Sequence, residues 1–234
     1  AGLYAAPTVI NNVETIANIP YIFRNGAAWL RQWGTEKSPG FKLFAVSGHV
    51  QRPGIYEAAL GTTMRELLEH AGGIRAGHSL KFWVPGGSSV PLLTEEHLDL
   101  PLTYEDMASA GTMLGTGTPM VFDDTTSVVK AVSRWAQFYK HESCGKCTPC
   151  REGTYWMTEL LGRLERGNGK DEDLATISSI CTQISGRSFC ALGDAATGPY
   201  PGAMKFFRGE FEAAVRQPVD EAFDPAATTV FAKV

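Results

Sequence analysis

The chain contains no apolar run that approaches the ~20 residues a transmembrane helix needs. It does not begin with a positively charged stretch followed by an apolar segment, so we expect no signal peptide. The chain also has little excess charge of either sign, because 21 lysines and arginines nearly balance 25 aspartates and glutamates and leave a formal net charge of −4. A charge this small and mixed does not predict binding to nucleic acid by electrostatics.

Cysteine is scarce as well, with five in 234 residues. An odd count argues against a disulfide framework, and the pattern of reduced cysteines predicts a cytoplasmic location. The chain begins at Ala1 without a methionine, so we expect a fragment or a processed product. Its length and an apolar content of 44% are enough for one large domain or two ordinary ones with a real core.

Three of the five cysteines form a tight motif. Cys144, Cys147 and Cys150 lie three residues apart within residues 142–153, and the glycine and proline between them allow the loop to bend. Cys190 is a fourth, distant candidate. Soft thiolates suit iron sulfide, and each of the four irons in a cubane cluster takes one external ligand. The spacing therefore predicts a [4Fe–4S] cluster on these four residues.

Three other interpretations of the motif are weaker. A structural zinc site with four cysteines usually has two close pairs, whereas here three cysteines are clustered and one is remote. Disulfides between near neighbours in so tight a loop would be poorly placed. A catalytic thiol needs a nearby base, and His141 is close in sequence, but a single nucleophile does not explain the triple spacing.

The region of residues 123–216 has the pattern of four amphipathic helices with short links, which predicts a helical bundle. The first helix is expected after a cap at 125–127, the second after the cysteine loop, the third from 171 or 173, and the fourth over 201–215. Cys181 falls on the apolar stripe of the third helix. It is therefore predicted to be a small buried hydrophobe and not a ligand.

Basic side chains lie next to the predicted ligands at Lys146, Arg151 and Arg187. Cations near a negatively charged cluster favour its reduced form and raise its reduction potential. The alternative is that these residues are only solvated, as basic residues on loops usually are.

The region of residues 41–122 alternates between short strands and turns, with one amphipathic helix at 62–70. Strands are expected at 41–46, at 47–50, after a turn at 53–54, at 80–84 and 90–93 as a hairpin, and at 120–122. This pattern predicts a compact α+β module of ubiquitin-like size. The glycine-rich turn at 85–89 lacks a Lys-Ser/Thr ending and a following helix, so a phosphate loop is not expected. His49, His70, His78 and His97 have no metal spacing and are predicted to face solvent or lie in turns.

The N-terminal segment, residues 1–40, contains a helical pattern for which Asn12 is a good N-cap. The side-chain amides of Asn11 and Asn12 could cap and turn the chain, or could hold an anion such as a phosphate at the start of the helix. The residues alone leave both interpretations open. At the other end, residues 217–234 are expected to form an extended tail that lies along a partner.

Four motifs in order carry a family resemblance. They are Asn-Asn-Val-Glu-Thr at 11–15, Pro-Gly-Gly-Ser-Ser at 85–89, the cysteine stretch at 142–153, and Cys-Ala-Leu-Gly-Asp at 190–194. Together they resemble the flavin- and NADH-binding subunits of respiratory complex I, which in bacteria form the F-subunit family of NADH-quinone oxidoreductase. The resemblance covers nearly the whole chain apart from the tail.

The resemblance implies a fold and a set of site residues. Residues 41–122 would be a soluble-ligand-binding β-grasp domain with a structural role, and the helical bundle would hold a [4Fe–4S] cluster on Cys144, Cys147, Cys150 and Cys190. Asn11, Asn12 and Thr15 match family positions near the phosphate and ribityl chain of FMN. Residues 1–40 would complete the flavin domain.

The resemblance also implies a function. In the family, NADH passes a hydride to FMN, and electrons continue one at a time through the cluster towards quinone. The implied partners are the [2Fe–2S] subunit and the multi-cluster subunit of the peripheral arm. The implied location is the cytoplasmic side of the inner membrane, without insertion into it.

The sequence departs from the family pattern at one point. The glycine-rich flavin and nucleotide loops of the family precede the segment seen here, and this chain lacks them. We therefore expect this chain alone to bind the cluster but neither FMN nor NADH tightly. A diaphorase subunit of an NAD-linked formate dehydrogenase or hydrogenase is an alternative with the same motifs. An alternative of another class is a non-enzymatic binding module stapled by zinc.

Overall fold

The computed structural model describes residues 2–219. The N-terminal segment and the sheet region contain η1 Leu3–Ala5, α1 Val13–Asn25, α2 Ala27–Leu30, β1 Phe41–Gly48, β2 Gly54–Ala59, α3 Met64–His70, β3 Leu80–Val84, η2 Glu95–His97, α4 Tyr104–Ser109 and β4 Met120–Asp123. The helical region contains α5 Val128–Glu142, α6 Thr148–Glu165, α7 Asp173–Ile184, α8 Ala191–Thr197 and α9 Pro199–Ala214. A sheet followed by helices confirms the α+β class. The expected tail lies outside the described residues from 220 onwards.

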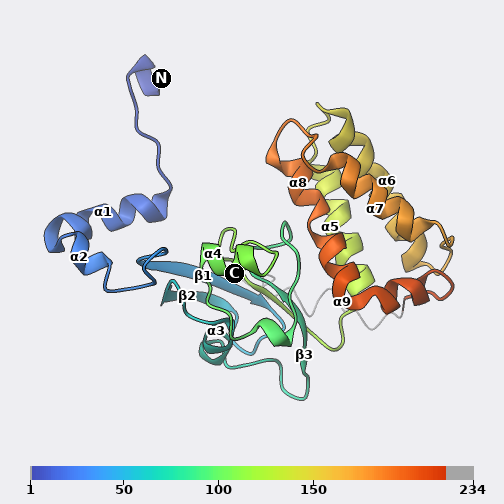
Figure 1. The fold of residues 1–234 in the computed structure, drawn as a ribbon, viewed down its shortest axis with the longest axis horizontal. Helices are drawn as coiled ribbons and strands as arrows, with labels where there is room; N and C mark the ends of the chain where they lie inside the picture. Colours follow the sequence, from blue (N-terminus) through green and yellow to red (C-terminus); the bar gives the residue numbers. More distant parts are fainter. Residues whose placement is uncertain (1, 220–234) are drawn as a thin grey trace, which may run out of the picture.

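The sheet has four strands in the order β2-β1-β4-β3. Strand β1 pairs antiparallel with β2, in a register that sets Phe41 opposite Ala59, and parallel with β4 on its other side. Strand β3 pairs antiparallel with β4 at the far edge. The predicted strand at 90–93 was wrong, because this stretch makes only an isolated bridge between Leu93 and Trp83. Figure 1 shows the sheet between α1 on one side and the five later helices on the other.

One face of the sheet is covered by α3, which the sequence correctly predicted. Thr63 accepts from the backbone N–H of Glu66 and the Glu66 carboxylate accepts from that of Thr63, so a complete capping box starts the helix. Leu67 of α3 is fully buried against Phe44 of β1 and Trp83 of β3. This cluster forms the core of the sheet module.

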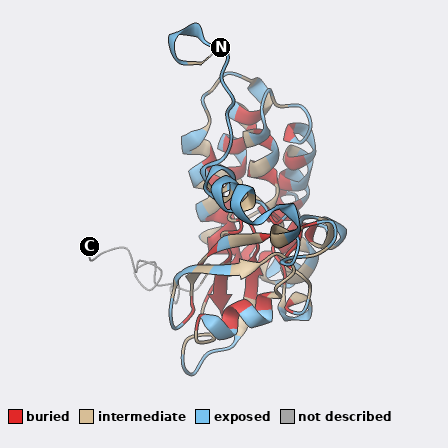
Figure 2. Ribbon diagram, turned by 90° about the vertical axis from the view of Figure 1, so that its left-hand side faces the viewer, coloured by how far each residue is buried: buried red, intermediate tan, exposed pale blue. Residues whose placement is uncertain are grey.

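A second core lies among α5, α6, α7 and α9. Val132, Leu161, Ile177 and Phe211 are all buried there, one from each helix in turn. The expected helices therefore form with their apolar stripes inward, and the short helix α8 is an addition that the sequence pattern did not predict. Figure 2 shows the buried residues concentrated along the facing sides of these helices and of the sheet.

The two cores meet at aromatic side chains. Phe82 of β3 stacks on Phe122 of β4 with ring centroids 4.5 Å apart, and Trp135 of α5 meets both rings edge-on. A polar contact supports the same junction, since Glu210 of α9 pairs with Lys81 of β3 at 2.7 Å. The helices are thus attached to the sheet through side chains of both regions.

The N-terminal segment is different from the rest, because α1 contains no buried residue (Figure 1). Asn12 caps α1 as predicted, and its side chain accepts from the backbone N–H groups of Glu14 and Thr15. The Glu14 carboxylate connects the helix to the sheet, at 3.0 Å from Lys42 Nζ and 2.7 Å from the backbone nitrogen of Leu43. No helix among residues 2–219 is both long and apolar enough to cross a membrane.

Candidate metal centre

The cysteine loop lies between two long helices. Helix α5 ends at Glu142, and the backbone N–H of Ser143 donates to Tyr139 O at 3.0 Å to close its last turn. Cys144 follows on the loop, Cys147 is the N-cap residue of α6, and Cys150 sits in the first turn of that helix. A positive φ of 77° at Gly145, a region that favours glycine, lets the chain reverse within the loop.

The fourth cysteine reaches the same place from the opposite side of the helical region. Cys190 is the N-cap residue of α8, and its neighbour Phe189 donates its backbone N–H to Cys147 Sγ at 3.5 Å. Lys146 Nζ on the first loop lies 4.7 Å from the ring centroid of Phe189 on the second, so the two loops are in contact. The structure therefore brings together the four cysteines that the sequence predicted as ligands.

The four thiols differ in exposure, and the pKa values of Cys147 and Cys150 are shifted in opposite directions. Cys150 is buried, Cys147 is half-buried, and Cys144 and Cys190 are exposed. The backbone N–H of Phe189 lowers the pKa of Cys147, with a contribution from the Ser188 hydroxyl. Burial raises the pKa of Cys150, and the neighbouring thiolates raise it further. A cation on all four would offset this repulsion and draw off their protons.

The donor set separates the two metal interpretations. Three of the cysteines come from one loop and the start of α6, and the fourth is the N-cap residue of α8. A structural zinc site usually takes two close pairs of cysteines, whereas each iron of a cubane cluster takes one thiolate. Four soft thiolates arranged as three and one therefore fit an iron–sulfur cluster better than one zinc ion.

The predicted basic residues have defined contacts. Arg151 donates to Gly145 O at 2.8 Å and so braces the turn of the cysteine loop. Lys146 Nζ lies 4.7 Å from the ring centroid of Phe189, which links the two loops that supply the ligands. Arg187 contacts the side chain of Gln183. Their effect on a reduction potential stays a prediction.

Sequence reasoning missed Phe189 and Ser143, which contact sulfurs directly. Phe189 is 77% exposed yet its N–H points at Cys147, and Ser143 Oγ lies 3.3 Å from Cys150 Sγ. The only signal in the sequence was adjacency, because each residue directly precedes a cysteine of the motif. The direction of a side chain or an N–H group could not be known from that adjacency.

Cys181 is buried in the helical core, as predicted. Its Sγ lies 3.9 Å from Met157 Sδ, and burial raises its pKa to about 12. The thiol is therefore protonated at neutral pH, and no resolved contact of Cys181 joins it to the other four cysteines.

The predicted flavin contacts lie at the other end of the molecule. A cavity of about 1000 Å³ opens between α1 and β1, and Asn12 and Thr15 are among the residues that line it, together with Lys42, Tyr21 and Trp29. Asn11 is not among the lining residues. Because the Asn12 oxygen already accepts two backbone N–H groups, the capping interpretation of Asn12 is confirmed, and contact with an anion stays a prediction.

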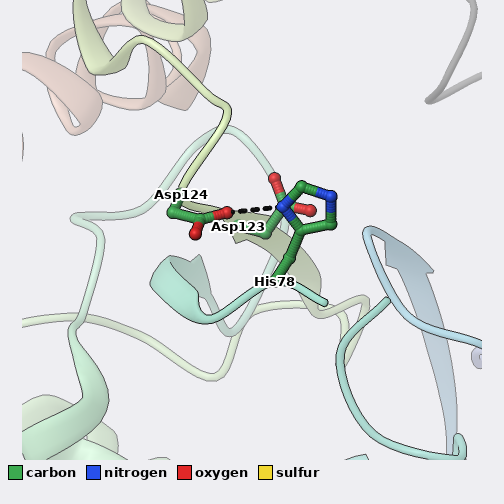
Figure 3. Close-up of side chains that lie close together, drawn as sticks. All are labelled: His78, Asp123 and Asp124. Atoms are coloured by element: carbon green, nitrogen blue, oxygen red, sulfur yellow. Dashed lines mark hydrogen bonds and ion pairs between the residues drawn. The ribbon is translucent and has the colours of Figure 1, made fainter. Parts of the chain in front are cut away.

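Another cluster of possible ligands lies at the C-terminal end of β4. Figure 3 shows His78, Asp123 and Asp124, whose ligand atoms are within 4.8 Å of one another. Arg75 already binds the Asp123 carboxylate at 2.6 Å, and Thr125 donates to its other oxygen at 2.6 Å. A carboxylate neutralised in this way is a poor cation ligand, so the cluster fits an internal ion-pair network better than a metal site.

The predicted environment of His49 was wrong, since this residue is only 2% exposed. Its Nδ1 lies 2.8 Å from an Asp123 oxygen and also accepts from the backbone N–H of Asp123 at 3.2 Å, while Nε2 is buried without a partner among the described residues. Burial lowers the pKa of His49, the nearby Arg75 and His78 charges act in the same direction, and Asp123 opposes them. The imidazole is therefore a neutral structural group under β4.

Comparisons with known proteins find two family models in the chain. Residues 130–214 match the family model described as the NADH-ubiquinone oxidoreductase-F iron-sulfur binding region, and residues 43–92 match the SLBB domain. The first match contains the cysteine loop, Cys181 and Cys190. The second covers most of the sheet module.

Two relatives carry the same name. The chain is 61% identical to the F subunit of NADH-quinone oxidoreductase from Mycobacterium bovis over 92% of this chain and 48% of that protein. It is 56% identical to the protein of the same name from Streptomyces coelicolor over 99% of this chain and 51% of that protein. The chain thus spans about half the length of the curated relatives it matches, and its resemblance to these F subunits is confirmed over that half.

Solved structures give a matching fold. A chain of an NAD+-reducing [NiFe]-hydrogenase in the air-oxidized state superposes with a TM-score of 0.82 at 36% identity, over 96% of this chain and 38% of that one. The same kind of hydrogenase in the H2-reduced state gives 0.81 at 35% identity.

Proposed function

We propose that this chain, which shares its iron–sulfur binding region and SLBB domain with the F subunits of NADH-quinone oxidoreductase, is the electron-transfer part of an NADH dehydrogenase module. Electrons from NADH-reduced FMN would pass through a [4Fe–4S] cluster on Cys144, Cys147, Cys150 and Cys190 towards quinone. The observation that carries the proposal is the contact between the two loops that bear these four cysteines, with the backbone N–H of Phe189 at 3.5 Å from Cys147 Sγ, inside the matched iron–sulfur region.

The residues around the site support one-electron transfer and not hydrolysis or acid–base work. When bound, a cubane cluster takes up and releases single electrons with little change in structure. The chain supplies four thiolates from two braced loops, a backbone N–H for Cys147, and a hydroxyl beside Cys150. The exposure of Cys144 and Cys190 leaves one side of the site open to an electron donor or acceptor.

We propose a division into four parts. Residues 1–40 would complete the flavin domain, 41–122 would be the β-grasp module, 123–216 would be a four-helix bundle of α5, α6, α7 and α9, and 217–234 would be a tail along a partner. Support for the first part comes from its exposed apolar side chains, of which Ile10, Val13 and Phe23 are each more than 80% exposed. A surface of this kind is typical of a contact with further protein.

Within the N-terminal part, Asn11, Asn12 and Thr15 would lie near the FMN phosphate and ribityl chain. The cavity beside α1 supports this for Asn12 and Thr15. The proposed partners are the [2Fe–2S] subunit and the multi-cluster subunit, on the cytoplasmic side of the inner membrane. That this chain alone does not oxidise NADH stays a prediction, which an assay with an artificial electron acceptor tests directly.

A second candidate function has a specific observation in its favour. The superposition on an NAD+-reducing [NiFe]-hydrogenase supports a diaphorase subunit of an NAD-linked hydrogenase or formate dehydrogenase. The identity of 61% to quinone oxidoreductase subunits against 36% to the hydrogenase chain favours the first candidate. Affinity isolation from the cells that encode the chain separates them, because co-isolated hydrogenase or formate dehydrogenase subunits would overturn the complex I assignment.

The cluster itself is tested by anaerobic purification and elemental analysis. We expect about four irons and four sulfides per chain, a brown colour, and a paramagnetic signal that appears on reduction. Bound zinc without iron, in a colourless protein, would reject the electron-transfer function and support the zinc-stapled binding module instead.

A further inference from the structure

We propose that Ser143 raises the reduction potential of the iron–sulfur cluster by donating a hydrogen bond from its hydroxyl group to the sulfur of Cys150. The inference rests on the proposed function, because it takes Cys150 as a cluster ligand. It assigns to Ser143 a positioning and tuning role that the spacing of the cysteines does not reveal.

The direction of the hydrogen bond follows from the chemistry of the two atoms. Ser143 Oγ lies 3.3 Å from Cys150 Sγ, and the backbone N–H of Gly145 donates to the same Oγ at 3.4 Å. A serine hydroxyl has one proton to give and two lone pairs to accept with. A metal-bound thiolate has no proton, so only the hydroxyl can be the donor in the contact with Cys150. Among the described residues, the Ser143 hydroxyl has no other acceptor for its hydrogen bond.

Both partners are held in place by further bonds. The backbone N–H of Ser143 donates to Tyr139 O at 3.0 Å and so fixes the residue to the end of α5. Tyr139 is itself buried, and its hydroxyl lies 3.2 Å from Ser88 Oγ in the glycine-rich turn. On the other side, Thr154 Oγ1 donates to Cys150 O at 2.8 Å. The contact is therefore part of the fixed framework and not a passing orientation of a loop side chain.

Because Cys150 is buried, this hydrogen bond affects the reduction potential more than hydrogen bonds to the exposed cysteines do. Cys150 is 5% exposed, whereas Cys144 and Cys190 are open to water that can supply hydrogen bonds to their sulfurs. A hydrogen bond to a charged group is stronger where the surroundings are poorly polarisable. Donation to a ligand sulfur stabilises the extra negative charge of the reduced cluster and so makes the potential more positive. Cys147 receives a backbone donor, which no side-chain substitution removes.

The test is a redox titration of the anaerobically purified chain, followed by electron paramagnetic resonance. Three variants are compared with the wild type: Ser143→Ala, Ser143→Thr, and the control Ser179→Ala on the exposed surface of α7. We expect Ser143→Ala to lower the ratio of reduced to oxidised protein at a fixed potential about tenfold, which for one electron is ~59 mV. Ser143→Thr keeps the hydroxyl and should restore the wild-type potential, and Ser179→Ala should not change it.

A second readout does not depend on the size of the shift. In D2O, the Phe189 N–H and water at the exposed sulfurs give coupled deuterons in every variant, and the reduced wild type and Ser143→Thr should show one further coupled deuteron that Ser143→Ala lacks. If Ser143→Ala fails to hold a cluster, Ser143→Val takes its place, since it has nearly the shape of Ser143→Thr, lacks the hydroxyl and should give a shift in the same direction.

The outcomes separate this inference from the function it rests on. A wild-type chain without iron would overturn both. A wild-type chain with a normal cluster, whose potential and deuteron coupling are the same in Ser143→Ala, would overturn only the role of Ser143. Equal shifts in Ser143→Ala and Ser143→Thr would also overturn it, because a loss of packing and not of the hydroxyl would then be the cause.

Discussion

Cys150 and Cys181 are both buried, yet their surroundings give the two thiols different chemistry. Cys181 lies among apolar side chains and Met157, and burial raises its pKa to about 12. Cys150 lies beside three other cysteines and the hydroxyl of Ser143. Among these neighbours the Ser143 hydroxyl favours the Cys150 thiolate, whereas burial and the other three thiolates favour the neutral thiol until a cation binds all four sulfurs.

Substitution of Cys190 and Cys181 tests this difference. Cys190→Ala removes one of four ligands, so we expect the chain to lose the cluster or to hold it in degraded form, measured as iron per chain. Cys181→Ala should keep the full iron content and reduce the free energy of unfolding by about 1 kcal/mol, because it leaves a small cavity in a packed core. Loss of iron in Cys181→Ala with retention in Cys190→Ala would reverse the ligand assignment.

The buried His49 makes the stability depend on pH. In the unfolded chain this histidine takes up a proton below its ordinary pKa of 6.5, whereas in the folded chain burial holds the pKa lower, with Arg75 and His78 acting in the same direction and Asp123 opposing. The unfolded state therefore binds more protons in this window. The contribution of His49 is fully present above pH 6.5 and is lost as the pH falls towards the lower folded-state value.

We expect His49→Asn to flatten this dependence, because an amide can still donate to Asp123 but does not titrate near neutral pH. The free energy of unfolding, measured between pH 7.5 and 5, should change less steeply in the variant than in the wild type. The difference in slope should be at most about 1.4 kcal/mol per pH unit. His70→Asn, at an exposed position, is the control. Parallel curves for the wild type and His49→Asn would contradict the neutral buried imidazole.

At the scale of elements, the pattern of apolar residues predicted most of the helices but not every strand. The stripes on α5, α6, α7 and α9 face the core as expected, because an amphipathic helix has few other ways to bury its apolar face. Residues 90–93 are apolar and buried but contain Pro91, which has no N–H to give to a strand ladder. Val90 and Leu92 are buried in the helical core and Leu93 in the core of the sheet module, and the local sequence does not show these contacts.

The same limit applies to the site. The spacing of the cysteines predicted four ligands on two loops, since that spacing follows from the chemistry of the cluster. The environment of His49 depends on Asp123, which is far from it in sequence and lies at the end of β4. The contacts of Ser143 and Phe189 with sulfur depend on how the two cysteine-bearing loops meet. Contacts of this kind arise only from the tertiary fold, and no local pattern carries them.

The approach of α6 to α7 gives a prediction at this scale. A Cβ added at Gly153 would lie 2.5 Å from Cδ1 and 2.6 Å from Cγ1 of Ile184, which is buried. Alanine gains up to about 1 kcal/mol in helix propensity, but overpacking a core costs about 1–3 kcal/mol. We therefore expect Gly153→Ala to lower the free energy of unfolding by about 1 kcal/mol, as measured by denaturation with urea.

The matched control for this substitution is Gly209→Ala in α9, where an added Cβ meets nothing within 4 Å. Only the propensity term acts there, so we expect this variant to be more stable than the wild type by about 0.5–1 kcal/mol. If both variants were stabilised, the close approach at Gly153 would not constrain the packing of the two helices.

For the whole molecule, two cores are joined through a narrow aromatic contact, and the cysteine site belongs to one of them. Within residues 2–219 the sheet core contains no cysteine, whereas the helical core is bordered by both ligand loops and shares Phe82 and Phe122 with the sheet. A cluster bound to Cys150 and Cys190 is a cross-link between the start of α6 and the start of α8. Its binding should therefore stabilise the helical region more than the sheet module.

Removal of iron tests this expectation. Closing a chain segment of about 40 residues between two ligands restricts the unfolded chain, and the entropy estimate used for a disulfide of that length gives about 4 kcal/mol. Native-state hydrogen exchange on the chain with and without iron should show protection of the amides of α6, α7 and α8 falling by up to about a thousandfold, which is the same energy at about 1.4 kcal/mol per tenfold. The amides of β1 and α3 serve as the internal control, because their core holds none of the four ligands and their protection should change much less. Equal losses in both regions would mean that the two cores unfold as one unit, and unchanged protection in α6–α8 would mean that the four sulfurs do not bind a common group.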